Sequence, residues 1–173
     1  MTFLWTDIEI GFTSNPDPIN ELGQKVEELD ALFGAQFQFA LKTVDETINN
    51  VGALQNDDVL FAPVVANATY DVEIWLLQNT NAAANFRLDL ALPAGAVWQS
   101  GHFDCNNTQI GVMTTNAVAG ITGTGADAYV MLKSAFVVGS TSGTAQLRWS
   151  QNTAHASNAI VRAGSRLKLT RVV

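Results

Sequence analysis

Two different spacings of apolar residues divide the chain near Asn56. Between 17 and 54 apolar residues recur every three or four positions, whereas from 55 onward they alternate with polar residues over short segments. The first spacing is that of one face of an α-helix, and the second is that of a half-buried β-strand. The sequence therefore predicts an N-terminal arm at 1–16, a helical stalk or anchor at 17–54 and a β head at 55–173.

The predicted helix begins with several start signals. Asp17 can cap the first turn, Pro18 suits the first helical position, and Glu21 lies near the positive end of the helix dipole. The apolar stripe that follows consists of Leu22, Val26, Leu29, Phe33, Phe37, Ala40, Val44, Ile48 and Val51. The stripe extends over roughly thirty residues, which corresponds to a helix about 45 Å long.

A stripe of this length indicates association with another chain, because a small β domain cannot cover it easily. The candidate oligomerisation and anchoring residues are Leu22, Val26, Leu29, Phe33, Phe37, Val44 and Ile48. Leu32, Phe39 and Leu41 widen the apolar face beyond a two-stranded seam, which favours a three-helix bundle or a docking groove over a lone dimer. A helix folded back onto its own β domain is the alternative.

The β head contains a series of short segments bounded by Gly, Asn, Ser, Thr or Pro. The expected strands are 58–65, 69–79, 86–92, 96–99, 108–114, 127–138, 144–151, 159–162 and 165–172. Pro63 confines the first of them to a sheet edge or a bulge. So many strands without an intervening helix predict a mainly β fold, an antiparallel sandwich of two sheets. A jelly roll is the favoured topology, and a seven-stranded immunoglobulin-like sandwich is the alternative.

Charge is distributed unevenly along the chain. Residues 1–58 carry eleven acidic and two basic side chains, whereas residues 59–173 carry five acidic and seven basic ones. The two ends can dock on neighbours of opposite sign, or they can be a solvated helix face and a basic edge strand. The net charge of −7 argues against nucleic acid as the partner. Apolar runs are short and interrupted by charge, so we expect no membrane insertion.

The sequence offers little that resembles a metal or cofactor site. His102, Asp104 and Cys105 lie close together, but zinc normally takes four ligands, and the only other histidine is His155. We expect this segment to be a polar loop, with the single cysteine as a small, partly buried filler. The glycine-rich run at 119–125 lacks the Lys and the following helix of a phosphate loop and is expected to be a mobile loop.

Enzymatic activity is not expected either. Asp71, Glu73 and Asp89 lie on outward faces of predicted strands and could form the carboxylate pair that glycoside hydrolysis requires. Only five acidic residues serve the whole β head, however, and any sheet exposes some of them. No Gly-x-Ser-x-Gly elbow is present.

Four aromatic residues are candidate contact residues. Trp75, Trp98, Tyr129 and Trp149 lie at or near positions that are expected to face outward or to lie in loops. Exposed aromatic rings stack on sugar rings or become buried between subunits. We favour subunit contact over glycan binding for these residues.

The sequence also resembles a family of virion proteins. The resemblance lies in LQNDDVLFAPVVANATYDVEIWLLQNTNAAANFRLDLALPAGA at 54–96, AGSRLKLTRV at 163–172, Trp5-Thr6-Asp7 and Pro-Ile-Asn-Glu-Leu at 18–22. These segments look like parts of the small virion proteins of tailed bacteriophages that infect actinobacteria, usually called minor tail, head-fibre or decoration proteins. The family's motifs are structural rather than catalytic.

The resemblance also implies how the protein assembles and where it is located. It implies a homotrimeric spike or fibre, assembled in the host cytoplasm, whose residues 1–54 contact other virion proteins of the capsid, portal, collar or tail. The β heads face solvent in that arrangement. The alternative is a tail-associated adhesin that recognises a host cell-surface glycan through the loops of the head. A structural role is favoured because those loops are poor in charged and aromatic residues.

Overall fold

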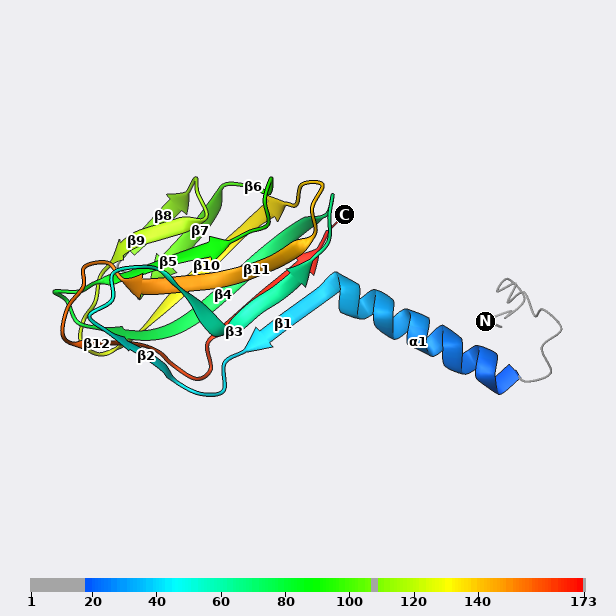
Figure 1. Ribbon diagram of the computed structural model, residues 1–173, viewed down its shortest axis with the longest axis horizontal. Coiled ribbons are helices and arrows are strands. Elements are labelled where there is room, and N and C mark those ends of the chain that lie inside the picture. Colours follow the sequence, from blue (N-terminus) through cyan, green and yellow to red (C-terminus); the bar gives the residue numbers. More distant parts are fainter. Residues whose placement is uncertain (1–17, 107–108, 173) are drawn as a thin grey trace, which may run out of the picture. The chain divides into compact units, whose positions relative to one another are not determined.

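The computed structural model describes residues 18–106 and 109–172, which form one helix followed by β-strands (Figure 1). Helix α1 is Pro18–Gln36. The strands are β1 Phe37–Leu41, β2 Glu46–Asn49, β3 Gln55–Val64, β4 Thr69–Thr80, β5 Phe86–Ala91, β6 Val97–Trp98, β7 Gly101–Cys105, β8 Gln109–Met113, β9 Ala117–Ile121, β10 Asp127–Val137, β11 Gly143–Gln151, β12 Asn158–Val161 and β13 Arg166–Arg171. The chain separates into two compact units, 1–34 and 35–173. The arm predicted at 1–16 lies outside the described residues.

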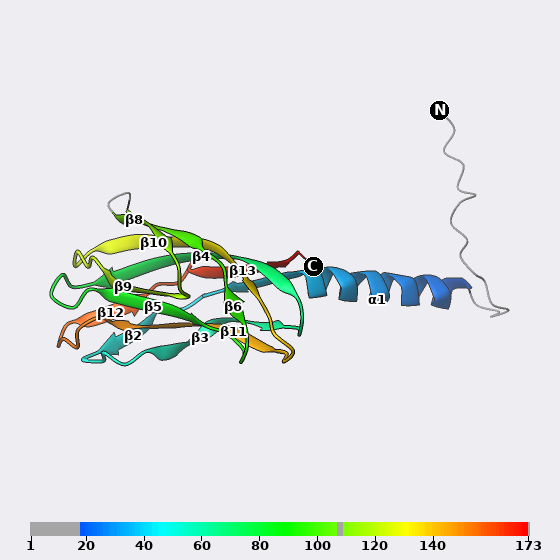
Figure 2. The ribbon, with the colours of Figure 1, turned by 90° about the horizontal axis from the view of Figure 1, so that it is seen from above.

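The strands form two antiparallel sheets packed face to face, which confirms the predicted β-sandwich. The larger sheet has nine strands, with the order β1-β13-β4-β10-β7-β8 along its main path and β2, β6 and β12 paired at its borders. The smaller sheet has the order β3-β11-β5-β9. Figure 2 shows β4, β10 and β13 in one layer and β3, β5 and β11 in the other. The jelly-roll topology stays a prediction.

Alternating side chains build the core between the two sheets. In β4, every second residue from Tyr70 is buried, and the residues between them face outward or are partly covered. The Tyr70 and Phe136 rings stack with centroids 5.5 Å apart, and the Phe86 and Trp149 rings stack at 5.8 Å. Each large apolar side chain buried in this way stabilises the fold by about 1.5–3 kcal/mol.

The helix is shorter than predicted, because residues 37–41 and 46–49 form strands of the sandwich. All five residues of β1 pair with β13, from Phe37 opposite Thr170 to Leu41 opposite Arg166. Apolar residues in this stretch fit both a helical spacing and a strict alternation, so the spacing alone does not decide between helix and strand. Pairing with β13 decides it in favour of the strand. The predicted helical stalk at 17–54 is therefore wrong beyond Gln36, and the head begins near Ala35.

Most of the long strands occur close to their predicted positions, whereas the short strands β7 and β9, like β1 and β2, were not expected. The strand with Pro63 lies at an edge of the smaller sheet, as predicted. Strands β7 and β9 occupy stretches that were expected to be a polar loop and a mobile loop. β7 pairs with β10 on one side and β8 on the other. Its first residue must be small, because a Cβ on Gly101 would lie 2.5 Å from Ser134 Cβ.

In the part of the chain that the structure describes, no helix is both long enough and apolar enough to cross a membrane.

Candidate functional site

Helix α1 carries an apolar stripe whose described side chains are exposed. Leu22, Val26 and Leu29 have exposed fractions of 66%, 50% and 53%. Their spacing of four and three residues places them on one face of the helix. The side chain of Phe33, the next residue of the predicted stripe, lies outside the described part of the structure. Half or more of the surface of each of these three side chains is therefore in contact with water.

Strand β1 presents a second exposed apolar surface, here called the β1 outer face, which consists of Phe37, Phe39 and Leu41. These side chains alternate with Gln38 and Ala40 and are 50%, 53% and 46% exposed. β1 is an end strand of the nine-stranded sheet. Exposed rings in a row at a sheet edge are typical of surfaces that become covered by another protein.

Two other residues of the predicted stripe lie elsewhere in the head. Val44 follows β1 and is 72% exposed. Ile48 lies in β2, pairs with Ala159 and is only 7% exposed. The prediction that Ile48 contacts another subunit is therefore wrong, because its side chain forms part of the core.

Basic side chains of β13 lie beside the β1 outer face. The Arg166 guanidinium lies 5.0 Å from the centre of the Trp75 ring, and Lys168 Nζ lies 5.5 Å from the centre of the Phe37 ring. Lys168 Nζ also lies 3.0 Å from Glu73 Oε1. That hydrogen bond is the main cause that lowers the pKa of Glu73. The basic C-terminal strand is thus an interior strand, between β1 and β4, whose charge is partly balanced within the chain.

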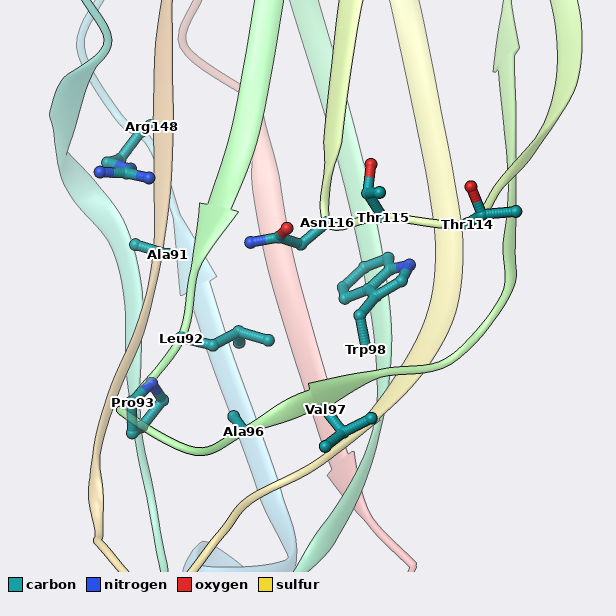
Figure 3. A pocket seen from close by; sticks show the side chains of 10 residues that line it. All are labelled: Ala91, Leu92, Pro93, Ala96, Val97, Trp98, Thr114, Thr115, Asn116 and Arg148. Atoms are coloured by element: carbon teal, nitrogen blue, oxygen red, sulfur yellow. The ribbon is translucent and has the colours of Figure 1, made fainter.

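A pocket of about 600 Å³ lies in the head (Figure 3). Its lining comes from the end of β5 and the segment that links it to β7, the turn between β8 and β9, and β11. The lining residues are Ala91, Leu92, Pro93, Ala96, Val97, Trp98, Thr114, Thr115, Asn116 and Arg148. In the view of Figure 3, Asn116 lies between the Trp98 ring and Arg148.

The polar groups of this pocket are held in fixed positions. Asn116 Nδ2 donates hydrogen bonds to Asp89 Oδ1 at 3.1 Å and to Leu90 O at 2.8 Å. The Arg148 guanidinium forms an ion pair with Asp89 Oδ2. Trp98 Nε1 is buried and has no hydrogen-bond acceptor among the described residues. The pocket thus combines an aromatic ring, an amide and a cation, which is a combination that can bind a polar ring-shaped ligand.

The four candidate aromatic residues have different surroundings. Trp75 is 37% exposed on the outer face of the larger sheet, and Tyr129 is partly covered on the same sheet. Trp98 lines the pocket and packs against the core. Trp149 is fully buried against Phe86, so the prediction that it faces outward is wrong. Its neighbour in the alternating pattern of β11 is the residue that reaches the pocket, Arg148.

Of the three carboxylates considered for a hydrolytic pair, Asp89 lies in a different sheet from the other two. Asp71 and Glu73 lie in β4 of the larger sheet, whereas Asp89 lies in β5 of the smaller one. None of the ten residues that line the pocket is acidic. Asp89 uses both of its carboxylate oxygens to hold Asn116 and Arg148, so its role there is to position these two side chains.

The three residues considered for metal binding lie in β7, with different degrees of burial. His102 is exposed, Asp104 is partly covered and Cys105 is 1% exposed. Burial, followed by the charge of Asp104, raises the pKa of Cys105, which keeps its thiol protonated. Across residues 18–106 and 109–172, no three His, Cys, Asp or Glu side chains lie together in a group that could hold a metal ion.

Comparison with solved structures gives a structural likeness, whereas comparison with family models and curated proteins gives none. No family model matches the chain, and no curated protein matches it. Among solved structures, the chain is similar to the tripod (BppUct-A-L) from the baseplate of bacteriophage Tuc2009, with 10% sequence identity and a TM-score of 0.35. The match covers 99% of this chain and 76% of that one. A likeness at this level carries no argument about function.

Proposed function

We propose that the protein is a non-enzymatic structural component of a bacteriophage virion, a short trimeric spike or fibre. The observation that carries the proposal is apolar surface on both units of the chain. Leu22, Val26 and Leu29 on α1, and the β1 outer face of the head, are about half exposed or more. Such surfaces are stable in water when other subunits or other proteins cover them. The sequence resemblance to small phage virion proteins supports the location of the protein in a phage virion.

In this proposal α1 and the arm before it form the contact with the rest of the virion, and the head faces outward. Helix α1 continues directly into β1, so its stripe and the β1 outer face are consecutive along the chain. A trimer formed around either surface removes large apolar side chains from water. The burial of such side chains is the main driving force for association of this kind.

Light scattering of the full chain at several concentrations tests the proposal. We expect a trimer, and we expect Val26→Glu to lower the mass because it places a charge in the stripe. Gln24→Glu is the matched control, since Gln24 is exposed on the same helix and lies away from the stripe. A wild-type chain that stays monomeric at every concentration contradicts the trimer.

A second pair of variants locates the contact within the head. Phe39→Ser changes a ring of the β1 outer face that is 53% exposed, and Phe61→Ser changes a ring of β3 that is 47% exposed. We expect only Phe39→Ser to weaken the trimer. A chain that begins at Ala35 retains β1 and β2, and its mass shows whether the head associates without the helix.

The pocket favours a second candidate function, a receptor-binding adhesin that recognises a host cell-surface glycan. Trp98 offers a ring on which a sugar can stack, and Asn116 and Arg148 supply polar groups nearby. A glycan array with the wild-type chain tests this function. Thr114→Trp is the matched variant, because this exposed lining residue then fills part of the pocket. Equal glycan binding by both chains contradicts a role for the pocket.

A further inference from the structure

A buried amine lies against two carboxylates inside the head. Lys42 follows β1, Glu46 begins β2, and Asp57 lies in β3. The side chains of Lys42 and Asp57 are 2% and 0% exposed, and that of Glu46 is 14% exposed. Lys42 Nζ lies 3.0 Å from both Asp57 Oδ1 and Asp57 Oδ2, and 2.5 Å from Glu46 Oε2. The amine is therefore within contact distance of the Asp57 carboxyl group and of a second acid.

Surrounding groups fix this arrangement. Gln55 Nε2 donates to Glu46 Oε1 at 3.0 Å, and the backbone N of Asp58 donates to Glu46 Oε2 at 3.3 Å. The backbone of Lys42 is held on both sides, since its N donates to Ser165 O and its O accepts from Gly164 N, each at 2.8 Å. A nucleophile and an electrophile that are held together gain effective concentration and lose little entropy when they react.

The two oxygens of Asp57 have different partners. Oδ1 accepts hydrogen bonds from the backbone N of Val59 at 3.0 Å and of Leu60 at 2.8 Å, besides its contact with Lys42. For Oδ2 the contact is with Lys42 Nζ. Two backbone N–H groups on one oxygen are the arrangement that stabilises negative charge on that oxygen during acyl transfer. Oδ2 of Asp57 can then act as the leaving oxygen.

We propose that Lys42 and Asp57 condense to form an intramolecular amide bond, with Glu46 as the catalytic proton carrier. Glu46 takes a proton from the Lys42 ammonium group, and the neutral Nζ attacks Asp57 Cγ. The negative charge that develops on Oδ1 is stabilised by the N–H groups of Val59 and Leu60. The Nζ–Cγ bond forms, the Cγ–Oδ2 bond breaks, and Oδ2 leaves as water with two protons that came from Nζ.

The electrostatics of the cluster suit the proton carrier. Burial is the main cause that raises the pKa of Glu46, and the charge of Asp57 adds to it. Burial by itself lowers the pKa of Lys42, but its hydrogen bonds to Glu46 and Asp57 outweigh burial, so that the pKa is raised. The reaction therefore starts from the ammonium form, and the short contact with Glu46 is the route by which the proton leaves.

The bond has a structural consequence for the head. β1 belongs to the nine-stranded sheet and β3 to the four-stranded sheet, so an amide between Lys42 and Asp57 joins the first strands of both sheets covalently. The linked residues are 15 positions apart. Closing a loop of that size restricts the unfolded chain in the way that a disulfide does. This inference does not depend on the proposed function.

The intact mass of the denatured full-length chain tests the proposal. We expect the wild-type chain to be lighter than its sequence by one water molecule. We expect Lys42→Arg, which keeps the charge and offers no amine, to have the full mass of its sequence. A full mass for the folded wild-type chain overturns the proposal and leaves an ion-pair cluster. Loss of water in Lys42→Arg also overturns it, because another residue is then dehydrated.

Tryptic digestion and a further variant locate the bond and test the carrier. Because trypsin does not cleave after an acylated lysine, we expect residues 26–87 to stay together as one peptide in the wild-type digest. Separate peptides 26–42 and 43–87 contradict the bond. In Glu46→Gln we expect the full mass, with folding checked by circular dichroism. Folded Glu46→Gln that loses water as completely as the wild-type chain overturns the role of Glu46.

Discussion

Asp45 and Glu46 are neighbours in the chain, yet their carboxylates lie in opposite surroundings. Glu46 joins Lys42 inside the head, where the lysine side chain is 2% exposed. Asp45 joins Arg162 at the surface, where the two side chains are 43% and 29% exposed and lie 2.7 Å apart. Each cation has a second acidic partner, which is buried Asp57 in one case and exposed Asp127 in the other. One cation with two carboxylates thus occurs twice in the head, once exposed at the surface and once buried.

The comparison shows that burial, and not the number of ion pairs, decides what each cluster does. Water and salt screen the surface cluster, and a charge that loses its partner there is simply hydrated. In the buried cluster a charge without its partner has no water to replace it, so each group depends on the others. The same exclusion of water is what brings an amine and a carboxyl group together as potential reactants.

The largest effect is expected for Asp57→Ala, which breaks the buried cluster. This change leaves the Lys42 ammonium with only one acidic partner, and it removes the acceptor of the N–H groups of Val59 and Leu60. We expect a loss of about 3–5 kcal/mol in the free energy of unfolding. Chemical denaturation followed by tryptophan fluorescence measures the loss.

Asp58→Ala is the matched control, since Asp58 is the next residue of the same strand and is exposed. We expect this variant to stay within about 0.5 kcal/mol of the wild-type chain. Equal losses for Asp57→Ala and Asp58→Ala would contradict the difference between buried and exposed charge in β3.

A smaller effect is expected when Lys42, the cation of the buried cluster, is replaced. Lys42→Met leaves Glu46 and Asp57 as two buried acids without a cation, and we expect it to cost about 2–3 kcal/mol at neutral pH. The pKa of Glu46 is already raised and rises further without Lys42. A group with a raised folded pKa binds a proton in the folded state first, so stability is regained as the pH falls toward its ordinary value of 4.5.

Arg162→Met is the surface counterpart of that experiment. Its partners Asp45 and Asp127 remain hydrated, so we expect little change in the denaturation midpoint at neutral pH. Denaturation curves of both variants at neutral pH and near pH 5 make the comparison. The contrast between the two clusters is contradicted if Arg162→Met is as destabilising as Lys42→Met. It is also contradicted if a lower pH does not raise the stability of Lys42→Met.

The sequence predicted the sandwich because long strands such as β4 and β10 carry an alternation that only one structure satisfies. It failed at 37–41 and 46–49, where the helical spacing continues but pairing of β1 with β13 and of β2 with β12 decides for strands. It also placed Trp149 outward, although Arg148 is the residue of that pair that reaches the surface. The alternation in β11 contains this information once the charged residue, rather than the aromatic one, is taken as the outward position.

Neither ion cluster was predicted, for two different reasons. Lys42 lies between the apolar residues of the predicted stripe, and nothing in the local pattern indicates that its side chain is 2% exposed. Arg162 and Asp45 are 117 positions apart and meet only after the fold has formed. The pocket residues Asn116 and Arg148 are separated in the same way. Sites that depend on long-range contacts need the structure, whereas the helix stripe at Leu22 is visible in the sequence.

The smallest effect is expected for Asp45→Asn, which weakens the surface cluster without removing its cation. A backbone hydrogen bond from Ala163 N at 2.8 Å is the main cause that lowers the pKa of Asp45, and the hydrogen bond from Arg162 comes second. A lowered folded pKa means that the ionised carboxylate stabilises the folded state. The stabilisation is fully present above the ordinary value of 3.8 and is lost as the pH falls through the lowered value.

The pH dependence therefore has the opposite sign to that of the buried cluster. We expect the difference in midpoint between the wild-type chain and Asp45→Asn to be small at pH 6 and to disappear once the pH is below the lowered pKa of Asp45. Added salt reduces it further, because exposed pairs are screened. Urea denaturation across this pH range, at low and high salt, measures both trends. A difference that grows as the pH falls contradicts the lowered pKa of Asp45, and with it the contrast between the two neighbouring carboxylates.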